Sequence, residues 1–396
     1  MRRSSTPRPS PPPRRTAVPG QGEPLAPGWA DPAAPLTEAV AIKGRGAVSN
    51  LAGRFESVDR FAVDDGWADP DPALEPAPDT RVLVEKARSI ITRNRSPDVP
   101  FDLSINPYRG CEHGCIYCYA RPNHGYVGLS PGLDFETRLF AKTNAAELFA
   151  QELARPGYRC EPINIGAVTD PYQPIERRFG ITRALLRVAS EYRQPVTLIT
   201  KASLVERDLD LLSALAQDRL AGVFVTITTL DAVLARKLEP RASAPWRRLE
   251  SVRRLASAGI EVGVSLGPVI PFVNDHEIET LLAAAKEAGA SSAFYTVLRL
   301  PLEVDPLFRQ WLQAHFPDRA TRVMHRIEDM RGGRANDPRF FSRMKGEGAF
   351  AQLIRMRFAN TVRKLGLNQV RPGLRTDLFR RPGFIAEQAG SQLALI

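Results

Sequence analysis

The chain has 396 residues, 43% of them hydrophobic and 25% charged, which is enough to bury a large core and excludes a wholly disordered or low-complexity protein. No apolar run is long enough to cross a bilayer and the N-terminus lacks a signal-peptide pattern, so we expect a cytoplasmic protein without a membrane partner. The net charge of +10 suits a phosphate-bearing partner such as nucleic acid, although arginines of the N-terminal tail and solvated helix faces account for much of it.

The N-terminal hundred residues divide into two segments by composition. Residues 1–40 are rich in Pro and Arg and poor in large apolar residues, which predicts a disordered tail because such a segment buries too little to offset its ordering entropy. Residues 41–100 include an apolar stretch around 81–92 and are expected to form an irregular N-terminal extension packed on the main domain.

Residues 101–303 alternate short β-branched runs with amphipathic stretches, which is typical of βαβ units around a parallel sheet. The predicted strands are 101–106, 163–169, 196–200, 223–228, 261–269 and 293–298, and the predicted helices are 143–154, 182–192, 204–216, 245–258 and 275–288. Right-handed crossovers would curl six such units into a barrel or an arc of one, so the fold class is α/β.

Helical patterns continue beyond the last of these strands. They cover 305–315, 320–330 and 348–365 and predict a helical C-terminal region over 304–380, followed by a flexible tail at 381–396. His325, Arg331, Gly332, Gly333 and Arg334 in this region are candidates for the rim of a substrate opening.

Three cysteines follow the first predicted strand in the string CEHGCIYC: Cys111, Cys115 and Cys118. Their spacing suits a four-iron four-sulfur cluster, and because a trio of thiolates leaves one of the four irons open, that iron can take an exchangeable ligand. A disulfide is disfavoured, because four cysteines in a long chain without a secretory segment indicate a reducing compartment.

A zinc site is the alternative use of these cysteines. His113, His124 or Cys160 would have to supply the fourth ligand, although none stands in the paired-doublet arrangement typical of zinc sites. Together with the basic charge, this alternative would make the chain a non-catalytic zinc-dependent nucleic-acid-binding protein.

The cysteine motif, with Tyr117 directly before the third cysteine, resembles the signature of the radical S-adenosylmethionine (SAM) superfamily. The string YCY at 117–119, TD after the second strand, TK after the third, Glu239-Pro240 and GVSLGPVIP resemble the spore photoproduct lyase-like branch, over about 101–301. The strings SINPYRGCEHGCIYCYARP, TDPYQPIE and LEPRASAP are similar to those of an uncharacterised bacterial family related to these lyases.

This resemblance implies a fold, two cofactors and an electron donor. The expected core is a partial (β/α)6 TIM-like barrel whose cluster loop follows the first strand. The open iron of the 4Fe–4S cluster would bind SAM, and one electron would cleave it to a radical that abstracts a hydrogen atom from the substrate. Flavodoxin or ferredoxin would supply that electron.

Ligands of parallel α/β barrels meet residues at the carboxyl ends of strands. Asp170 is a candidate acceptor for the SAM ammonium, with Thr169 beside it, and Lys201 is a candidate partner for the SAM carboxylate. The resemblance implies SAM contacts at Lys201 and Thr226. The alternative for Asp170 and Lys201 is to cap a turn and a strand end.

Adenine needs an apolar slot, for which Tyr117, Val269 and Ile270 are candidates. The alternative for the two aliphatic side chains is ordinary core packing.

One feature separates this chain from the lyases, and two questions about its substrate stay open. Ala167 stands where the characterised lyases carry a hydrogen-donating cysteine, and Cys160 precedes that strand, so repair of a thymine photoproduct does not carry over. Nucleic acid competes with small molecules and peptides as the substrate. An arginine cluster before and on the helix predicted at 245–258 either follows a phosphate backbone or forms a solvated face: Arg241, Arg247, Arg248, Arg253 and Arg254.

Overall fold

A computed structural model describes residues 41–56, 79–369 and 373–382. The disordered tail expected at 1–40 and nearly all of the flexible tail expected at 381–396 lie outside these ranges. Within the described residues, no helix combines the length and the apolar character that crossing a bilayer requires.

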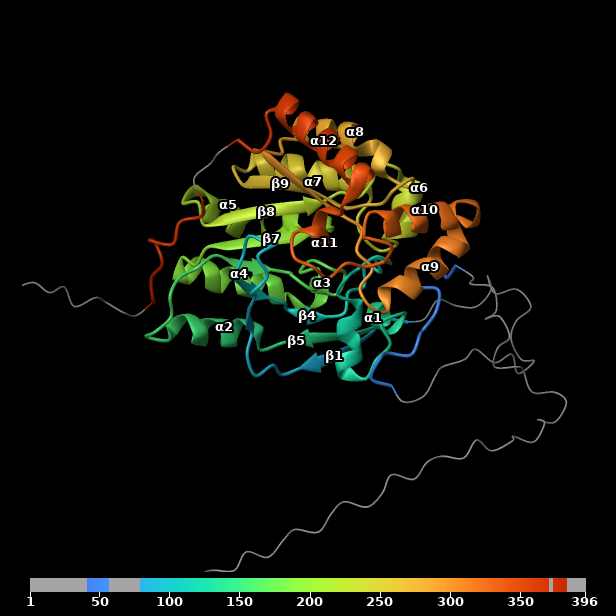
Figure 1. The fold of residues 1–396 in the computed structure, drawn as a ribbon. Coiled ribbons are helices and arrows are strands. Elements are labelled where there is room, and N and C mark those ends of the chain that lie inside the picture. The colour runs from blue at the N-terminus through green and yellow to red at the C-terminus, as the bar shows by residue number, and fades with distance from the viewer. Residues whose placement is uncertain (1–40, 57–78, 370–372, 383–396) are drawn as a thin grey trace, which may run out of the picture. The chain divides into compact units, whose positions relative to one another are not determined.

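The main sheet has seven strands in the order β10-β9-β8-β7-β6-β3-β2 (Figure 1). Its six consecutive parallel strands confirm the predicted α/β fold with a partial barrel, and each lies beside its neighbour in chain order. They are β3 (Leu103–Ile105), β6 (Ile163–Ile165), β7 (Val196–Thr200), β8 (Ala221–Thr226), β9 (Glu261–Val269) and β10 (Ser292–Val297). The seventh strand, β2 (Ile91–Arg93), pairs antiparallel with β3 at the opposite edge from β10.

Helices cover the outside of this sheet. The longer ones are α2 (Ala145–Ala154), α4 (Ile181–Tyr192), α5 (Leu209–Gln217), α7 (Pro245–Ser257) and α8 (Ile278–Glu287). Shorter turns complete the crossovers: α3 (Glu176–Phe179), η3 (Ser203–Asp208), α6 (Ala232–Leu238) and η4 (Asp275–Glu277). Every helix expected from the sequence in this region is present, whereas α3 and α6 were not anticipated.

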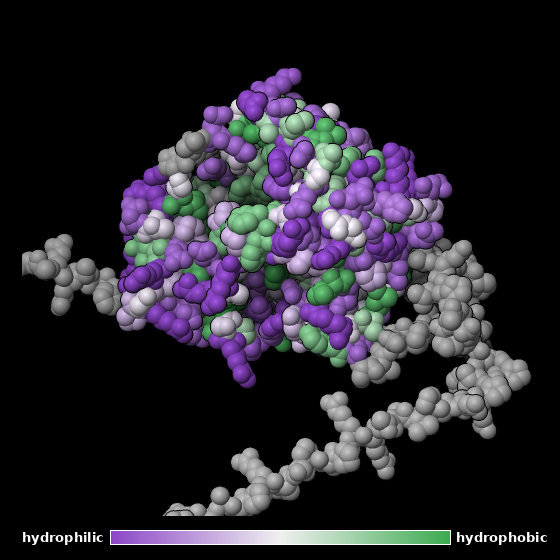
Figure 2. Space-filling view, in the orientation of Figure 1, coloured by the Kyte–Doolittle hydropathy of each residue, from purple (hydrophilic) through white to green (hydrophobic). Residues whose placement is uncertain are grey.

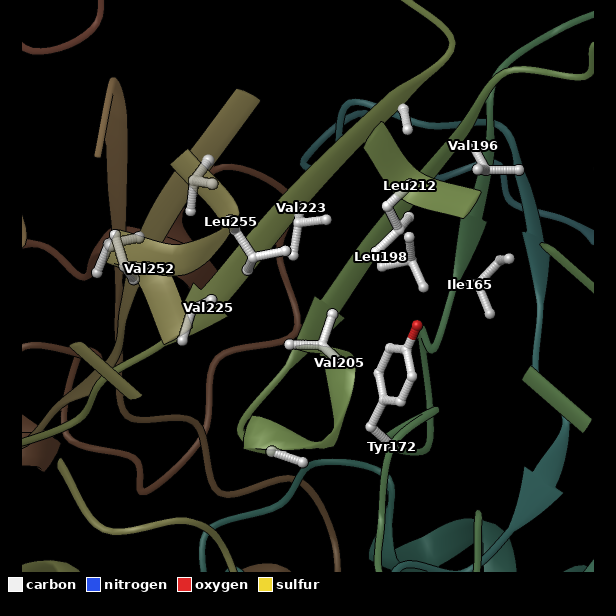
Figure 3. Close-up of a cluster of buried hydrophobic side chains, with 14 of the residues drawn as sticks. Ile165, Tyr172, Val196, Leu198, Val205, Leu212, Val223, Val225, Val252 and Leu255 are labelled. Atoms are coloured by element: carbon white, nitrogen blue, oxygen red, sulfur yellow. The ribbon is translucent and has the colours of Figure 1, made fainter. Parts of the chain in front are cut away.

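The core forms where apolar strand residues meet the apolar sides of these helices. Figure 3 shows Leu198 of β7 close to Leu212 of α5, and Val223 and Val225 of β8 beside Leu255 of α7. All five side chains are at most 1% exposed, and burial of one such side chain contributes about 1.5–3 kcal/mol. This packing fixes the strands relative to the helices, and it thereby fixes the starting points of the loops that follow the strands.

The N-terminal extension contributes strands where irregular chain was expected. Besides β2, β1 (Arg81–Glu85) pairs in parallel with β5 (Arg138–Lys142), and β5 pairs antiparallel with β4 (Tyr108–Arg109). The 3-10 helix η2 (Arg121–Val127) and α1 (Asp134–Thr137) lie between β4 and β5 in the chain. The strand β4 of this small sheet directly precedes the cysteine loop in the chain.

The C-terminal region is helical, as predicted. It consists of α9 (Val304–His315), α10 (Pro317–Asp329), α11 (Ser342–Lys345) and α12 (Gly348–Leu365). Figure 1 places α11 on the open side of the sheet, and Figure 2 shows that this face is mostly hydrophilic and hollowed near its centre.

Candidate functional site

The cysteine loop lies just after β3 and β4, at the carboxyl end of the first parallel strand. All three of its thiols are free; Cys111 and Cys115 are 7% exposed, whereas Cys118 is only partly buried. The backbone of the loop is tied to two other segments, because Cys111 N donates to Phe135 O over 3.0 Å and Ile116 N donates to Leu238 O over 3.2 Å.

A buried ion pair between Arg121 and Glu136 stabilises the backbone conformation of this loop. Arg121 is 0% exposed and donates to the carbonyl oxygens of Gly114 and Cys115 as well as to the carboxylate of Glu136. Glu136 also accepts from the amide nitrogen atoms of Gly46 and Ala47. Gly114 has φ +68°, a left-handed conformation that favours glycine in the turn.

The donor set fits a cluster. Burial, followed by the charges of Asp170 and the other two cysteines, raises the pKa of the Cys111 thiol well above its ordinary value. Burial likewise raises the pKa of Cys115 to about 12, although Lys201 opposes the shift. The three sulfurs therefore interact electrostatically, and three thiolates would repel one another in this loop. The positive charge of bound metal would offset that repulsion and allow all three thiols to ionise.

The residues that a zinc site would need have other partners. His113 Nδ1 lies 3.3 Å from Asp170 Oδ2, His124 Nε2 lies 2.9 Å from Arg138 O, and Cys160 Sγ lies 3.6 Å from Gln194 Oε1. Cys160 also precedes β6, so it stands near the opposite end of the sheet from the loop that follows the parallel strand β3. Across the described ranges, no three or more His, Cys, Asp or Glu side chains are gathered around a position for one metal ion, and this holds for Cys111, Cys115 and Cys118 as well.

A buried carboxylate, Glu239, connects the loop to the sheet. It accepts hydrogen bonds from the Tyr117 hydroxyl and from Thr228 Oγ1, and its second oxygen pairs with Arg248. Both Glu239 and Arg248 are at most 2% exposed. Burial opposes ionisation of Glu239, but Arg248 and Lys201 outweigh it and lower its pKa, so the group is a carboxylate.

Lys201 is a cation whose charge acts on Cys115. It directly follows β7, and its ammonium lies 5.8 Å from the centre of the Tyr117 ring. Burial acts to lower the pKa of Lys201, but the charges of Cys115 and Glu239 outweigh it and raise the pKa. The structure thus brings Lys201, Tyr117 and Cys115 together at the carboxyl end of the barrel.

Asp170 and Thr169 are engaged within the protein. The Asp170 carboxylate accepts from the amides of Tyr172 and Lys201 and from Thr200 Oγ1, and despite burial the His113 imidazole helps to lower its pKa to about 2. The Thr169 hydroxyl donates to Gly110 O over 2.7 Å. The Asp170 carboxylate therefore caps the turn after β6, as the turn-capping alternative for Asp170 anticipates, whereas Thr169 connects this turn to Gly110.

The remaining candidates for the SAM pocket divide between two clusters. Ile270 belongs to the same buried hydrophobic cluster as Cys115 and Tyr117, whereas Val269 belongs to the main core. Thr226 ends β8 and is 3% exposed, and its carbonyl oxygen accepts from Arg248 Nη1 over 3.0 Å.

The arginine cluster before and on α7 is ion-paired. Arg247 and Arg254 pair with Glu206, Arg253 pairs with Glu250, and Arg241 pairs with Glu112. Arg248 points inward to Glu239. No signal in the sequence indicates this inward orientation, because Glu239 and Arg248 meet only through the fold of the segment between α6 and α7.

Of the candidate rim residues, Arg331 is 2% exposed and His325 is exposed. Arg331 donates to the carbonyl oxygens of Val297, Leu298 and Arg343. It therefore ties α10 to the end of β10.

The sequence model of the radical SAM superfamily matches residues 105–285, the range that holds the cysteine loop and the strands β6 to β9. Uncharacterised proteins of Mycobacterium tuberculosis and Mycobacterium bovis are 34% identical over 226 residues, which is 57% of this chain and 66% of theirs. The match thus spans a little under two thirds of these relatives. An uncharacterised protein of Methanocaldococcus jannaschii is 26% identical over 242 residues, 60% of this chain and 84% of its own.

Solved structures give the same fold. A cysteine-to-serine mutant of spore photoproduct lyase aligns with a TM-score of 0.51 at 16% identity, over 72% of this chain and 80% of the lyase. The lyase complexed with dinucleoside spore photoproduct aligns with a TM-score of 0.51 at 15% identity over the same shares. At this identity the likeness establishes the shared partial barrel.

Proposed function

We infer, from the premise that residues 105–285 of this chain belong to the radical SAM superfamily, that the protein is a radical SAM enzyme. The observation that carries this proposal is the set of three free thiols at Cys111, Cys115 and Cys118 on one buried loop at the carboxyl end of the first parallel strand. These thiols would hold the 4Fe–4S cluster.

When bound, the cluster and SAM supply a reductive cleavage whose radical product abstracts a hydrogen atom from the substrate. The chain's part is to hold the three thiolates, to balance their charge and to shield the site from water. Arg121 and Glu136 fix the backbone of the loop, and Lys201 offers a partly buried positive charge near the thiolates. A site that is fixed in this way and excludes water when its cofactors are bound would favour one reactive geometry.

The SAM contacts remain part of the proposal. Lys201 would bind the SAM carboxylate, because its ammonium lies over the Tyr117 ring and its charge interacts with that of Cys115. Thr226 would offer its hydroxyl, and the Tyr117 ring with Ile270 would flank adenine. Asp170 and Thr169 would act indirectly, by positioning other residues. The Lys201 amide nitrogen donates to Asp170 Oδ2 over 2.8 Å, so Asp170 would help to position Lys201.

The substrate, the electron donor and the location complete the proposal. Nucleic acid is the leading substrate class, supported by the net charge of +10 and by the likeness in fold to a lyase solved with a dinucleoside lesion. We propose flavodoxin or ferredoxin as the reductant and the cytoplasm as the location, since four free cysteines indicate a reducing compartment. Because the substrate is not identified, lyase chemistry is one of the reaction types that this proposal includes.

Replacement of one cysteine tests the proposal. Cys115→Ala, reconstituted with iron and sulfide without oxygen, should lose the brown colour, bound sulfide and all 5′-deoxyadenosine formation from SAM. Cys160→Ala should keep all three, because Cys160 lies away from the loop. A wild-type chain that stays colourless and binds one zinc, or a Cys115→Ala variant that still forms deoxyadenosine, would overturn the proposal.

A further inference from the structure

Three arginines from separate segments gather near the end of β10. Arg299 follows β10, Arg331 follows α10, and Arg343 lies in α11. Arg331 Nη1 donates to the carbonyl oxygen of Arg343 over 3.2 Å, and Arg299 Nη1 lies 3.5 Å from Met344 Sδ. The side chain of Arg343 in turn reaches Asp98 and Ser96.

Two of these guanidinium groups have unused donors. Nε of Arg299 and Nε of Arg331 are buried without a hydrogen-bond partner among the described residues. Arg331 is 2% exposed, so water around it is scarce. A buried N–H without a partner is unfavourable, and a rearrangement that brought an acceptor to it would offset that cost.

The positive charges of the group exceed the negative ones. Asp98 is the acidic group that acts on Arg299, and it already pairs with Arg343, while Asp337 acts on Arg331 and pairs with the exposed Arg339. Burial and then Arg343 lower the pKa of Arg299, and burial and then Arg299 lower the pKa of Arg331 to about 10. The three guanidinium groups therefore face two carboxylates, Asp98 and Asp337, and Asp337 is shared with Arg339, so positive charge is in excess.

This arginine group lies beside the cysteine loop. The guanidinium carbon of Arg299 is 5.6 Å from the centre of the Tyr119 ring, and Tyr119 directly follows Cys118. The Tyr119 hydroxyl donates to Ala167 O, which fixes the ring between the loop and the end of β6. A ligand held by Arg299 would therefore extend along Tyr119 toward the cysteines.

We propose that Arg299, Arg331 and Arg343 form a binding subsite for a phosphate group of the substrate. The proposal rests on the proposed function for the meaning of "substrate", but the subsite itself does not depend on the cluster. Phosphate is favoured over a carboxylate because one phosphate group carries up to two negative charges and three acceptor oxygens, which suit an excess of positive charge spread over several guanidinium groups. Guanidinium groups are suited to this pairing by their planar fork of donors.

Phosphate binding to the cluster-free full chain tests the subsite directly. Inorganic phosphate, titrated at constant ionic strength and about pH 7.5, should raise the unfolding temperature and give a saturable isotherm, whereas malonate should do so more weakly. Arg299→Gln should weaken phosphate binding about tenfold or more, because charge-assisted hydrogen bonds are lost. Arg253→Gln removes the same charge from an exposed side chain of α7 and should bind phosphate as the wild type does.

Folding of the variants is controlled within the same experiment. Arg299→Gln relieves repulsion and should not lower the unfolding temperature in phosphate-free buffer. Arg299→Lys keeps the charge without the fork and should bind with intermediate affinity. Phosphate binding that is absent, equal to that of malonate, or unchanged in Arg299→Gln would overturn the proposal.

The source of the phosphate is read from two further ligands. A nucleoside 5′-monophosphate presents a terminal phosphate, and a dinucleoside monophosphate presents only an internal diester. Arg299-dependent binding of either supports the subsite and identifies the type of phosphate, whereas binding of neither overturns it for nucleotide substrates. Since no arm uses SAM or iron, failure here leaves the cluster assignment intact, and failure of the Cys115 experiment leaves this subsite intact.

Discussion

Glu239 connects the cysteine loop, the sheet and α7 through one carboxylate. Its partners are Tyr117 on the loop, Thr228 after β8 and Arg248 on α7. A charge this deeply buried is tolerated only because Arg248 is equally buried beside it. The pair therefore fixes the orientation of α7 relative to the loop, and it adds little stability compared with a well-packed apolar pair.

Glu239→Gln should lower the free energy of unfolding by about 3 kcal/mol, because it leaves the Arg248 charge buried without its counter-ion. Denaturant titration measures this loss. Glu250→Gln breaks ion pairs of exposed arginines on the same helix and should change the free energy by less than about 1 kcal/mol. A double variant, Glu239→Leu with Arg248→Met, should recover much of the loss; equal losses in Glu239→Gln and Glu250→Gln would contradict this account.

Single residues differ in how far the sequence predicts them. The cysteines were predicted as ligands because the chemistry of a cluster demands a fixed local spacing, and Lys201 was predicted as a SAM contact because it follows a strand that the sequence delimits to the residue. Both assignments stay predictions. Glu239 and Arg248 were not paired in advance, since nothing local distinguishes an inward arginine from the exposed ones beside it on α7. The predicted contact of Asp170 with SAM stays a prediction, and the partners that its carboxylate has within the protein are set by tertiary structure.

Among the elements, the cysteine loop depends on a segment that precedes it by about seventy residues. Gly46 packs so closely against the loop that a Cβ atom there would lie 1.8 Å from the carbonyl oxygen of Gly114. The amides of Gly46 and Ala47 also satisfy Glu136, which pairs with Arg121 under the loop. The extension thus forms part of the site's support.

Gly46→Ala should destabilise the fold by about 1–3 kcal/mol or more, because backbone must move on one side of the contact. It should also lower the iron retained per chain after reconstitution, since the displaced atom belongs to the cysteine loop. Gly53→Ala is the matched control: its Cβ would lie 3.5 Å from the nearest atom, and both measurements should stay near wild type. Full iron content and unchanged stability in Gly46→Ala would refute the close contact.

The elements that the sequence predicts well are those with a strong period. The bounds of β7, β9 and α12 agree with the prediction to the residue, because buried strands and a long amphipathic helix carry their own pattern. The strands β1 and β5 were missed: each has five residues, and they pair across more than fifty positions. Local pattern carries no information about such long-range pairing, and β1 is half exposed.

On the scale of the whole molecule, the barrel is open, with β10 and β2 as the two edges of the main sheet. Residues 331–345 touch both sides of this opening. Arg331 and Lys345 donate to carbonyl oxygens of β10, at Val297 and Tyr295, while Arg343 binds Asp98 and Ser96 in the turn between β2 and β3. This segment therefore connects the two edges beside the cysteine loop, where a sheet alone would leave unpaired backbone groups.

Asp98 is the residue by which this connection is tested. Its side chain is 1% exposed, and it accepts from Arg343 Nε and from the amide of Phe341, so Asp98→Asn leaves a largely buried guanidinium group without its counter-ion. The local opening free energy of residues 337–345 should fall by about 3 kcal/mol, which corresponds to roughly 100-fold faster amide hydrogen exchange there. Protection of β7 and β8 should be retained, because those strands unfold only with the core. Asp305→Asn removes an exposed i, i+4 pair on α9 and should leave exchange over 337–345 unchanged. Unaltered exchange in Asp98→Asn would show that the segment is held by its contacts with β10 alone.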